Sequence, residues 1–334
     1  MRDLYTRLSK VGFDSKWLRA VVLPDWWDDA LAAIPFNRAA AEAAISGFLG
    51  IPLRALRDPG AALAKPTVTD VCFKRNRKTA VRELATALQV ARQTAKIVAS
   101  VVGNLPPFAW GQSAKHVRET ILDSNPTVTL DGLVEYCWSR GIAVIGVTGF
   151  PKKAKRFDGV AMYEGIRPVV ILSSNRDGPA WLAFHLAHEL GHLMLGHVRP
   201  GDSAILDANL SAGVKDDTEL EADEFALEVL TGSPVGILFE RSGHKACEVG
   251  PLAVQFVRDQ SLKIDPSVIV LIYCKSTDYW GVAQGALEAI GAAKGGQEVI
   301  ATALANHLDF ENLSDAETRF LSATCKLPTD AILT

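Results

Sequence analysis

His188-Glu189-Leu190-Gly191-His192 is the stretch that decides the fold of this 334-residue chain. On a helix, residues four apart lie on one face, so His188 and His192 can bind one metal ion. Glu189, next to the first histidine, is the candidate general base. This spacing is typical of zinc hydrolases. The alternative is a core helix whose polar groups have ordinary hydrogen-bond partners.

The residues around this stretch predict a largely buried helix. Pro179 is a helix-start signal, an apolar run extends from Trp181 to Leu195, and Gly196 is a helix-stop signal. Unpaired imidazoles and a carboxylate would be costly inside such a helix. A bound metal ion removes that cost, so the context favours a metal site.

A second, acidic helix is predicted to begin near residue 218. Glu219 and Asp223 share one face of it. A catalytic zinc site uses three protein ligands and leaves the fourth position to water, so Glu219 is the candidate third ligand. Asp223, one turn further on, is the candidate to accept the free ring N–H of His188 or His192, which would fix that ring's tautomer.

Two nearby polar residues are given other roles. Glu221 points away from the Glu219 face and can form a capping box with Thr218, and acids in a first turn also favour the helix dipole. His197 would lie about 140° around a continuous helix from His192. We therefore interpret His197 as a helix-end residue rather than a ligand.

At this point the sequence resembles the ImmA/IrrE metallo-endopeptidases, over roughly residues 105 to 290. The preceding segment fits too, with Asp158-Gly159-Val160-Ala161 and a short strand over 167–174, and residues 251–286 resemble the closing segment of that family. The central matching strings are Phe184-His185-Leu186-Ala187-His188-Glu189-Leu190-Gly191-His192 and Glu219-Leu220-Glu221-Ala222-Asp223-Glu224-Phe225-Ala226.

The resemblance implies a zinc endopeptidase, with Mn²⁺ as an alternative metal. The metal would activate water and polarise the peptide carbonyl, while Glu189 passes the proton of the water to the leaving amine. The implied substrate is a regulatory protein of the repressor or antitoxin type. The competing interpretation is a DNA-binding transcriptional regulator that uses the peptidase fold for sensing or scaffolding.

Two further features of the site stay open from sequence alone. A residue that stabilises the oxyanion is expected, and Tyr163, His185 and His244 are candidates that spacing cannot place. Residues 169–172 predict a strand, which is either the edge strand that pairs with an extended substrate or an ordinary core strand.

Composition describes an ordinary globular protein with 48% hydrophobic and 22% charged residues. The N-terminus has no apolar signal region and no stretch has the length of a membrane span, so we expect a cytoplasmic protein without a membrane partner. Five widely spaced cysteines argue against a disulfide framework and a cysteine zinc site.

Charge is distributed unevenly along the chain. Residues 1–100 contain 16 Lys/Arg and 9 Asp/Glu, a balance of +7, whereas residues 101–334 contain 19 and 29, a balance of −10. The densest basic stretch contains Lys74, Arg75, Arg77 and Lys78, which are candidate contacts to the phosphates of duplex DNA. A solvated basic helix face is the alternative.

We expect an α+β chain with three parts. Residues 1–103 form a helical domain, in which residues 40–56 resemble a degenerate helix-turn-helix. Residues 104–290 form a zincin-like metallopeptidase domain with a small mixed sheet and metal-binding helices, and residues 291–334 form a helical extension. The linker is expected at 103–107.

Hydrophobic periodicity and the positions of Gly, Pro and capping residues predict the individual helices and strands. A strand is expected over 142–147, a strand or buried helix over 268–273, and a helix after Ser314 with Glu317 completing a capping box. Other helices are expected over 25–33, 38–49, 53–57, 78–102, 113–124 and 129–140.

Overall fold

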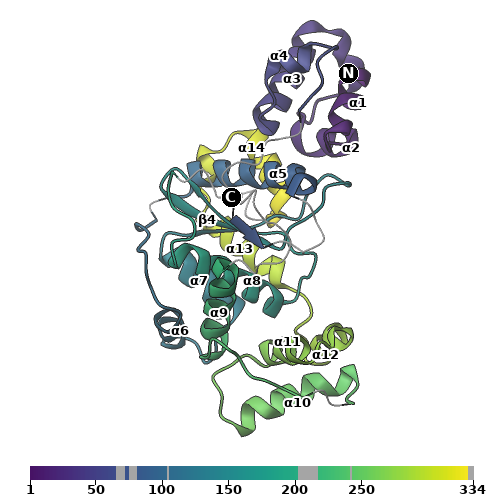
Figure 1. The fold of residues 1–334 in the computed structure, drawn as a ribbon. Coiled ribbons are helices and arrows are strands. Elements are labelled where there is room, and N and C mark those ends of the chain that lie inside the picture. Colours follow the sequence, from purple (N-terminus) through teal and green to yellow (C-terminus); the bar gives the residue numbers. More distant parts are fainter. Residues whose placement is uncertain (65–71, 75–80, 104, 202–216, 241–242, 330–334) are drawn as a thin grey trace.

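A four-stranded sheet lies between two helical layers at the centre of the molecule (Figure 1). The computed structural model describes residues 1–64, 72–74, 81–103, 105–201, 217–240 and 243–329. Helices precede, cover and follow the sheet, which confirms the expected α+β class.

The sheet has the strand order β1-β3-β4-β2. β3 (Gly159–Glu164) and β4 (Arg167–Leu172) form an antiparallel hairpin, and β2 (Ala143–Gly146) is parallel to β4. β1 (Cys72–Lys74) comes from far upstream and pairs antiparallel with β3, with Lys74 opposite Gly159. The sheet is therefore mixed, as predicted.

β4 is an inner strand, because β3 and β2 flank it. Of the two interpretations of residues 169–172, the core strand is correct and the substrate-pairing edge strand is wrong. The apolar run of β4 fits this position, since a strand that is covered on both faces has no solvent side on which to alternate polar residues. The outer position next to β3 is taken by β1.

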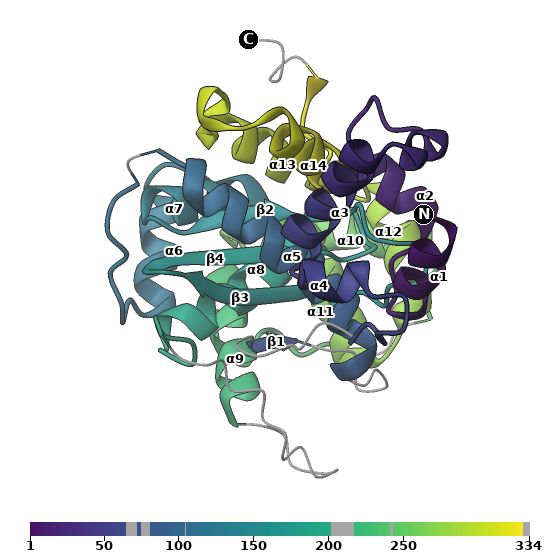
Figure 2. The same cartoon turned by 90° about the horizontal axis from the view of Figure 1, so that it is seen from above.

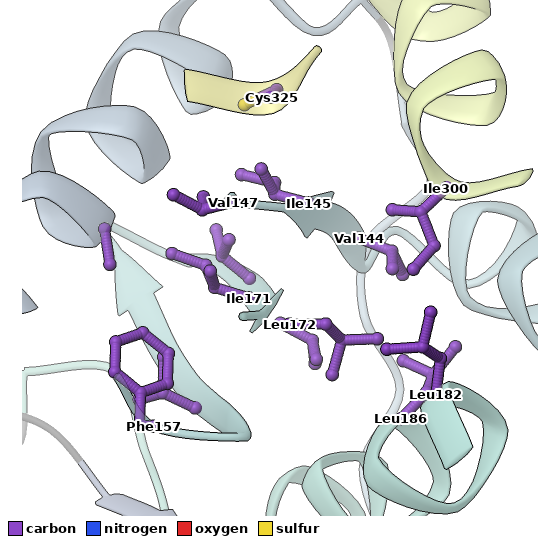
Figure 3. Packing of buried hydrophobic residues seen from close by; sticks show 14 of the residues in the cluster. Val144, Ile145, Val147, Phe157, Ile171, Leu172, Leu182, Leu186, Ile300 and Cys325 are labelled. Atoms are coloured by element: carbon purple, nitrogen blue, oxygen red, sulfur yellow. The ribbon is translucent and has the colours of Figure 1, made fainter. Parts of the chain in front are cut away.

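The main core forms where helices pack on the buried strands (Figure 3). Val144 and Ile145 of β2 and Ile171 of β4 have no exposed surface. Leu182 and Leu186 contribute from the helix Pro179–Met194. Burying each such side chain contributes roughly 1.5–3 kcal/mol, so this core fixes the helix on the sheet.

One face of the sheet is covered by α5 (Val81–Val101), which crosses the strands in the view of Figure 2. The other face carries α7 (Leu130–Ser139) and α8 (Pro179–Met194). α13 (Gly296–His307) packs on β2 and α7, and α14 (Asp315–Cys325) packs on α5. The C-terminal helices α13 and α14 are thus part of the helical layers that surround the sheet.

The first sixty residues form a group of helices at one end of the molecule (Figure 1). α3 (Pro35–Leu49) and α4 (Leu53–Arg57) are joined by a turn at Gly50, which gives the expected pair of helices. The Arg57 guanidinium pairs with Glu42 of α3. The smaller elements there are α1 (Arg2–Lys10), α2 (Ser15–Trp17), a π-helix over Leu18–Val22 and a 3-10 helix over Asp29–Ala33.

Most of the remaining expected elements are confirmed. Residues 268–273 are helical, within α11 (Pro266–Thr277), and α14 begins with the Ser314–Glu317 capping box. α6 (Ala114–Leu122) is also present where it was predicted.

The packing crosses both predicted domain limits. β1 and α5 precede residue 103 but join or cover the sheet of the later residues, and α13 lies beyond residue 290 but packs on β2. The division into 1–103, 104–290 and 291–334 stays a prediction.

A lower lobe holds α10 (Ala246–Asp259), α11 and α12 (Ala283–Ala289) (Figure 1). Among the described helices, none combines the length and the apolar character that crossing a membrane needs. The four cysteines whose side chains are described are free thiols, as expected.

Candidate metal centre

The two helices that carry the candidate ligands approach each other closely. α8 begins with Pro179 at a first-turn position, where the missing N–H is not needed. A Cβ on Gly191 would lie 3.2 Å from the Phe225 side chain of α9 (Asp217–Thr231). The absence of a side chain at Gly191 therefore lets α9 pack closely against α8.

Three side chains from α8 and α9 converge on one point. The Nε2 atoms of His188 and His192 are 3.1 Å apart. Glu219 places one carboxylate oxygen 3.5 Å from Nε2 of His188 and the other 3.3 Å from Nε2 of His192. Both imidazoles are buried, whereas the Glu219 side chain is 37% exposed, so solvent reaches the cluster from the α9 side. This group could hold a metal ion.

His188 has a carboxylate behind it. Its Nδ1 lies 3.0 Å from Oδ1 of Asp223, one helical turn after Glu219, as the sequence predicted. The other oxygen of Asp223 lies 3.8 Å from Nζ of Lys275 on α11. A carboxylate at this distance favours a proton on Nδ1 of His188, and the neutral ring then carries its lone pair on Nε2.

We expect Asp223→Ala to weaken metal binding by roughly 10- to 100-fold, the usual loss when the partner of a ligating histidine is removed. Asp223→Asn should weaken it less, because the amide oxygen can still accept from Nδ1 of His188. Chelator competition against the metal-free protein measures both affinities. Equal affinity of Asp223→Ala and the wild type would contradict a role in orienting His188.

His192 also has a partner behind it, and the sequence did not predict it. Nδ1 of His192 lies 3.0 Å from Nδ1 of His197, and Nε2 of His197 lies 2.9 Å from Glu221. His197 is outside the ligand cluster, as expected. The capping role given to Glu221 stays a prediction, and the structure adds a contact of its carboxylate with His197.

The donor set fits a divalent cation. The Glu221 carboxylate requires a proton on Nε2 of His197, so Nδ1 of His197 accepts and Nδ1 of His192 donates. Nε2 of His192, like Nε2 of His188, then carries a lone pair toward the Glu219 carboxylate. Acceptor atoms that face one another within 3.5 Å repel each other unless a proton or a metal cation lies between them. Two imidazoles and one carboxylate are a usual zinc ligand set.

Local electrostatics keep this donor set in its metal-binding form. Burial is the main cause that lowers the pKa of His192, and it favours the neutral ring. Burial, the largest influence, raises the pKa of the Glu219 carboxyl, but the neighbouring His188 and His192 rings together lower it to about 2. Glu219 is therefore ionised at neutral pH.

Glu189 is fully buried between α8 and the sheet. A Cβ on Gly159 of β3 would lie 2.7 Å from Oε1 and 2.9 Å from Cγ of Glu189. Real Cβ atoms do not make contacts this short, so only glycine leaves room for the carboxylate. The register of the sheet places Lys74 of β1 opposite this glycine.

We expect Gly159→Ala to reduce cleavage by on the order of 10²-fold with metal binding retained, because the new methyl group displaces Glu189 but no ligand. Gly281→Ala is the matched control, since a Cβ there meets nothing within 4 Å. Cleavage rate and metal content, measured on both variants, test this. An undiminished rate in Gly159→Ala would show that the position of Glu189 is not critical.

The three oxyanion candidates have different surroundings. Tyr163 of β3 is on the same side as Gly159, stacks on Trp110 with ring centroids 5.6 Å apart, and burial raises the pKa of its hydroxyl. His185 is buried 3.9 Å from Asp158. The oxyanion role stays unassigned among these candidates.

His244, the third candidate, is half exposed and lies 3.8 Å from Glu248 of α10. It lines a cavity of about 370 Å³ against α11. Its described contacts therefore belong to the lower lobe.

The basic stretch is only partly described. Lys74 lies in β1, within the sheet next to the candidate metal centre. Arg75, Arg77 and Lys78 lie outside the described residues. The DNA contact proposed for these four residues stays a prediction.

Two histidines and a buried glutamate lie on one helix, a second glutamate comes from the next helix, and a mixed sheet lies beside them. This arrangement defines a metallopeptidase-type domain. Residues 139–233 match the family model described as the IrrE N-terminal-like domain, Peptidase_M78. The segment from the end of α7 to just beyond the end of α9 is therefore similar to the domain of this family, within the longer stretch of 105–290 over which the sequence resembles it. Comparisons with curated proteins and with solved structures gave no match.

Proposed function

We propose that this protein is a zinc-dependent endopeptidase with His188, His192 and Glu219 as metal ligands. The observation that carries the proposal is the convergence of these three side chains, whose potential ligand atoms all lie within 4.8 Å of one another. Its position inside a Peptidase_M78 domain supports the same reaction class. Mn²⁺ is the alternative occupant, because the same ligands accept it.

Different residues of the chain have different roles in the proposed peptide-bond hydrolysis. A bound zinc ion would supply the Lewis acidity that activates water and polarises a peptide carbonyl. Glu189 takes the proton of the attacking water and delivers it to the leaving amine nitrogen. Burial against Gly159 holds its carboxylate in one place, and Asp223 keeps Nδ1 of His188 protonated.

The substrate we propose is a regulatory protein of the repressor or antitoxin type in the cytoplasm, as the resemblance to ImmA/IrrE peptidases implies. The chain's own β1 pairs with the outer edge of β3 beside Glu189. An extended substrate segment that used this edge would have to replace β1.

The test combines metal dependence with an unbiased search for cleavage. The full chain, treated with chelator and then reloaded with zinc or manganese, is incubated with a cell lysate, and new protein N-termini are identified by mass spectrometry. We expect a small set of new termini that appears with metal and disappears on chelation. Identical termini with and without metal would contradict the proposed function.

A further inference from the structure

The turn after α8 brings His197 back under His192. Gly196 has φ +74°, the left-handed conformation that favours glycine, and its N–H bonds to the Leu193 carbonyl at 3.2 Å. The N–H of His197 bonds to the His192 carbonyl at 2.9 Å. These two bonds form a Schellman motif, which fixes the backbone of His197 one turn below a candidate metal ligand.

The side chains continue this connection outward. His192 is 1% exposed and the His197 side chain 10%, whereas the Glu221 side chain is 57% exposed. The chain of contacts therefore leads from the buried ligand through a nearly buried imidazole to a carboxylate at the surface, at distances of 3.0 and 2.9 Å. Both contacts have ordinary hydrogen-bond lengths.

We propose that His197 and Glu221 are positioning residues that hold His192 in its metal-binding tautomer. Glu221 accepts from Nε2 of His197, Nδ1 of His197 accepts from Nδ1 of His192, and Nε2 of His192 is left with its lone pair toward the metal. His188 reaches the same state through one carboxylate, Asp223, whereas His192 uses an imidazole and a carboxylate in series.

The charges of His197 and Glu221 explain the advantage of placing an imidazole between His192 and the carboxylate. A carboxylate directly behind His192, as Asp223 lies behind His188, would place a further negative charge next to a buried ring, whereas the neutral His197 ring accepts a hydrogen bond without adding charge. The negative charge stands on Glu221, where water solvates it. The arrangement thus orients the ring of His192 and keeps the extra charge at the surface.

The proposal rests on the proposed metal site and is tested by zinc affinity together with tautomer state. We expect His197→Ala to weaken zinc binding by roughly 10- to 100-fold. His197→Asn should recover most of that loss, because the Asn oxygen can take the place of Nδ1 as acceptor. Glu221→Ala should weaken zinc binding in the same direction, and Glu224→Ala, an exposed change on the same helix, should not.

Two measurements separate positioning from packing. Thermal melting of the metal-free variants reports packing, and long-range ¹H–¹⁵N correlation spectra of histidine-labelled, metal-free protein report tautomers. The expected result is Nε2–H for His197 and Nδ1–H for His192. An Nδ1–H tautomer of His197 would overturn the positioning role alone. So would an equal loss of zinc affinity in His197→Ala and His197→Asn that parallels the loss of thermal stability in the two variants. A wild type that binds no divalent cation while keeping the expected tautomers would overturn the proposed function instead.

Discussion

Glu189→Gln is expected to reduce peptide-bond cleavage by a factor on the order of 10² to 10⁴ while metal binding is retained. The amide has the shape of the carboxylate and fits the space next to Gly159, but it cannot take a proton from water. The metal ligands are unchanged, so zinc content and affinity should match those of the wild type. The rate is measured on a substrate identified from the new N-termini, with Glu224→Gln as the surface control.

The same variant separates the two classes of function. If cellular activity depends on proteolysis, Glu189→Gln should behave like a deletion of the protein. Full cellular activity of a Glu189→Gln protein that cannot cleave would favour the DNA-binding regulator that uses the peptidase fold for sensing. In that case, DNA affinity that falls steeply with salt would be the next property to measure.

Glu219→Ala is expected to weaken zinc binding by at least about 100-fold. Structural zinc sites with four ligands have binding free energies of roughly 10–16 kcal/mol, so one ligand accounts for about 3 kcal/mol, or roughly two orders of magnitude. Zinc at about 1,000 times its Kd stabilises a folded protein by roughly 4 kcal/mol, so zinc should raise the Tm of the wild type far more than that of Glu219→Ala.

Glu224→Ala is the matched control on the same helix, because Glu224 is exposed and outside the ligand group. It should keep the full zinc-dependent rise in Tm. Equal rises in Tm for the wild type and Glu219→Ala would remove Glu219 from the ligand set, and His192→Ala would then show whether the two histidines bind metal without it.

The positions of the candidate ligands could be predicted from sequence because each depends on local periodicity. His188 and His192 share a face at helical spacing, and Glu219 and Asp223 repeat that spacing on the next helix. The sequence could not show how the two helices contact each other. The prediction therefore left open whether Asp223 accepts from the ring N–H of His188 or of His192. The structure places it on His188.

The sequence does not predict the contact between His192 and His197, because its pattern implies a helix that continues past His192. On a continuous helix His197 points away from His192, but α8 ends at Met194 and Gly196 turns the chain back. The available signal was the glycine followed by a histidine, which is a helix-ending pattern that fixes the next residue under the last turn. Glu221 could not be assigned until His197 was placed.

β1 was missed for a different reason. Cys72–Lys74 is short, is followed by basic residues in the sequence and pairs with β3 far along the chain, so no local pattern predicts it. α5 was predicted as a helix but was grouped with the N-terminal helices, because the linker-like residues near 103 suggested a boundary. The packing of α5 on β2, β3 and β4 is a long-range contact that no local pattern shows.

The central claim is that His188, His192 and Glu219 bind one zinc ion, and anomalous diffraction at the zinc edge from crystals of the full chain tests it most directly. The expected result is a single strong anomalous peak about 2.0–2.2 Å from both Nε2 atoms and from a Glu219 oxygen, with a fourth position open to water. A peak elsewhere, or a Glu219 side chain turned away from both imidazoles with no other ligand in its place, would contradict the account.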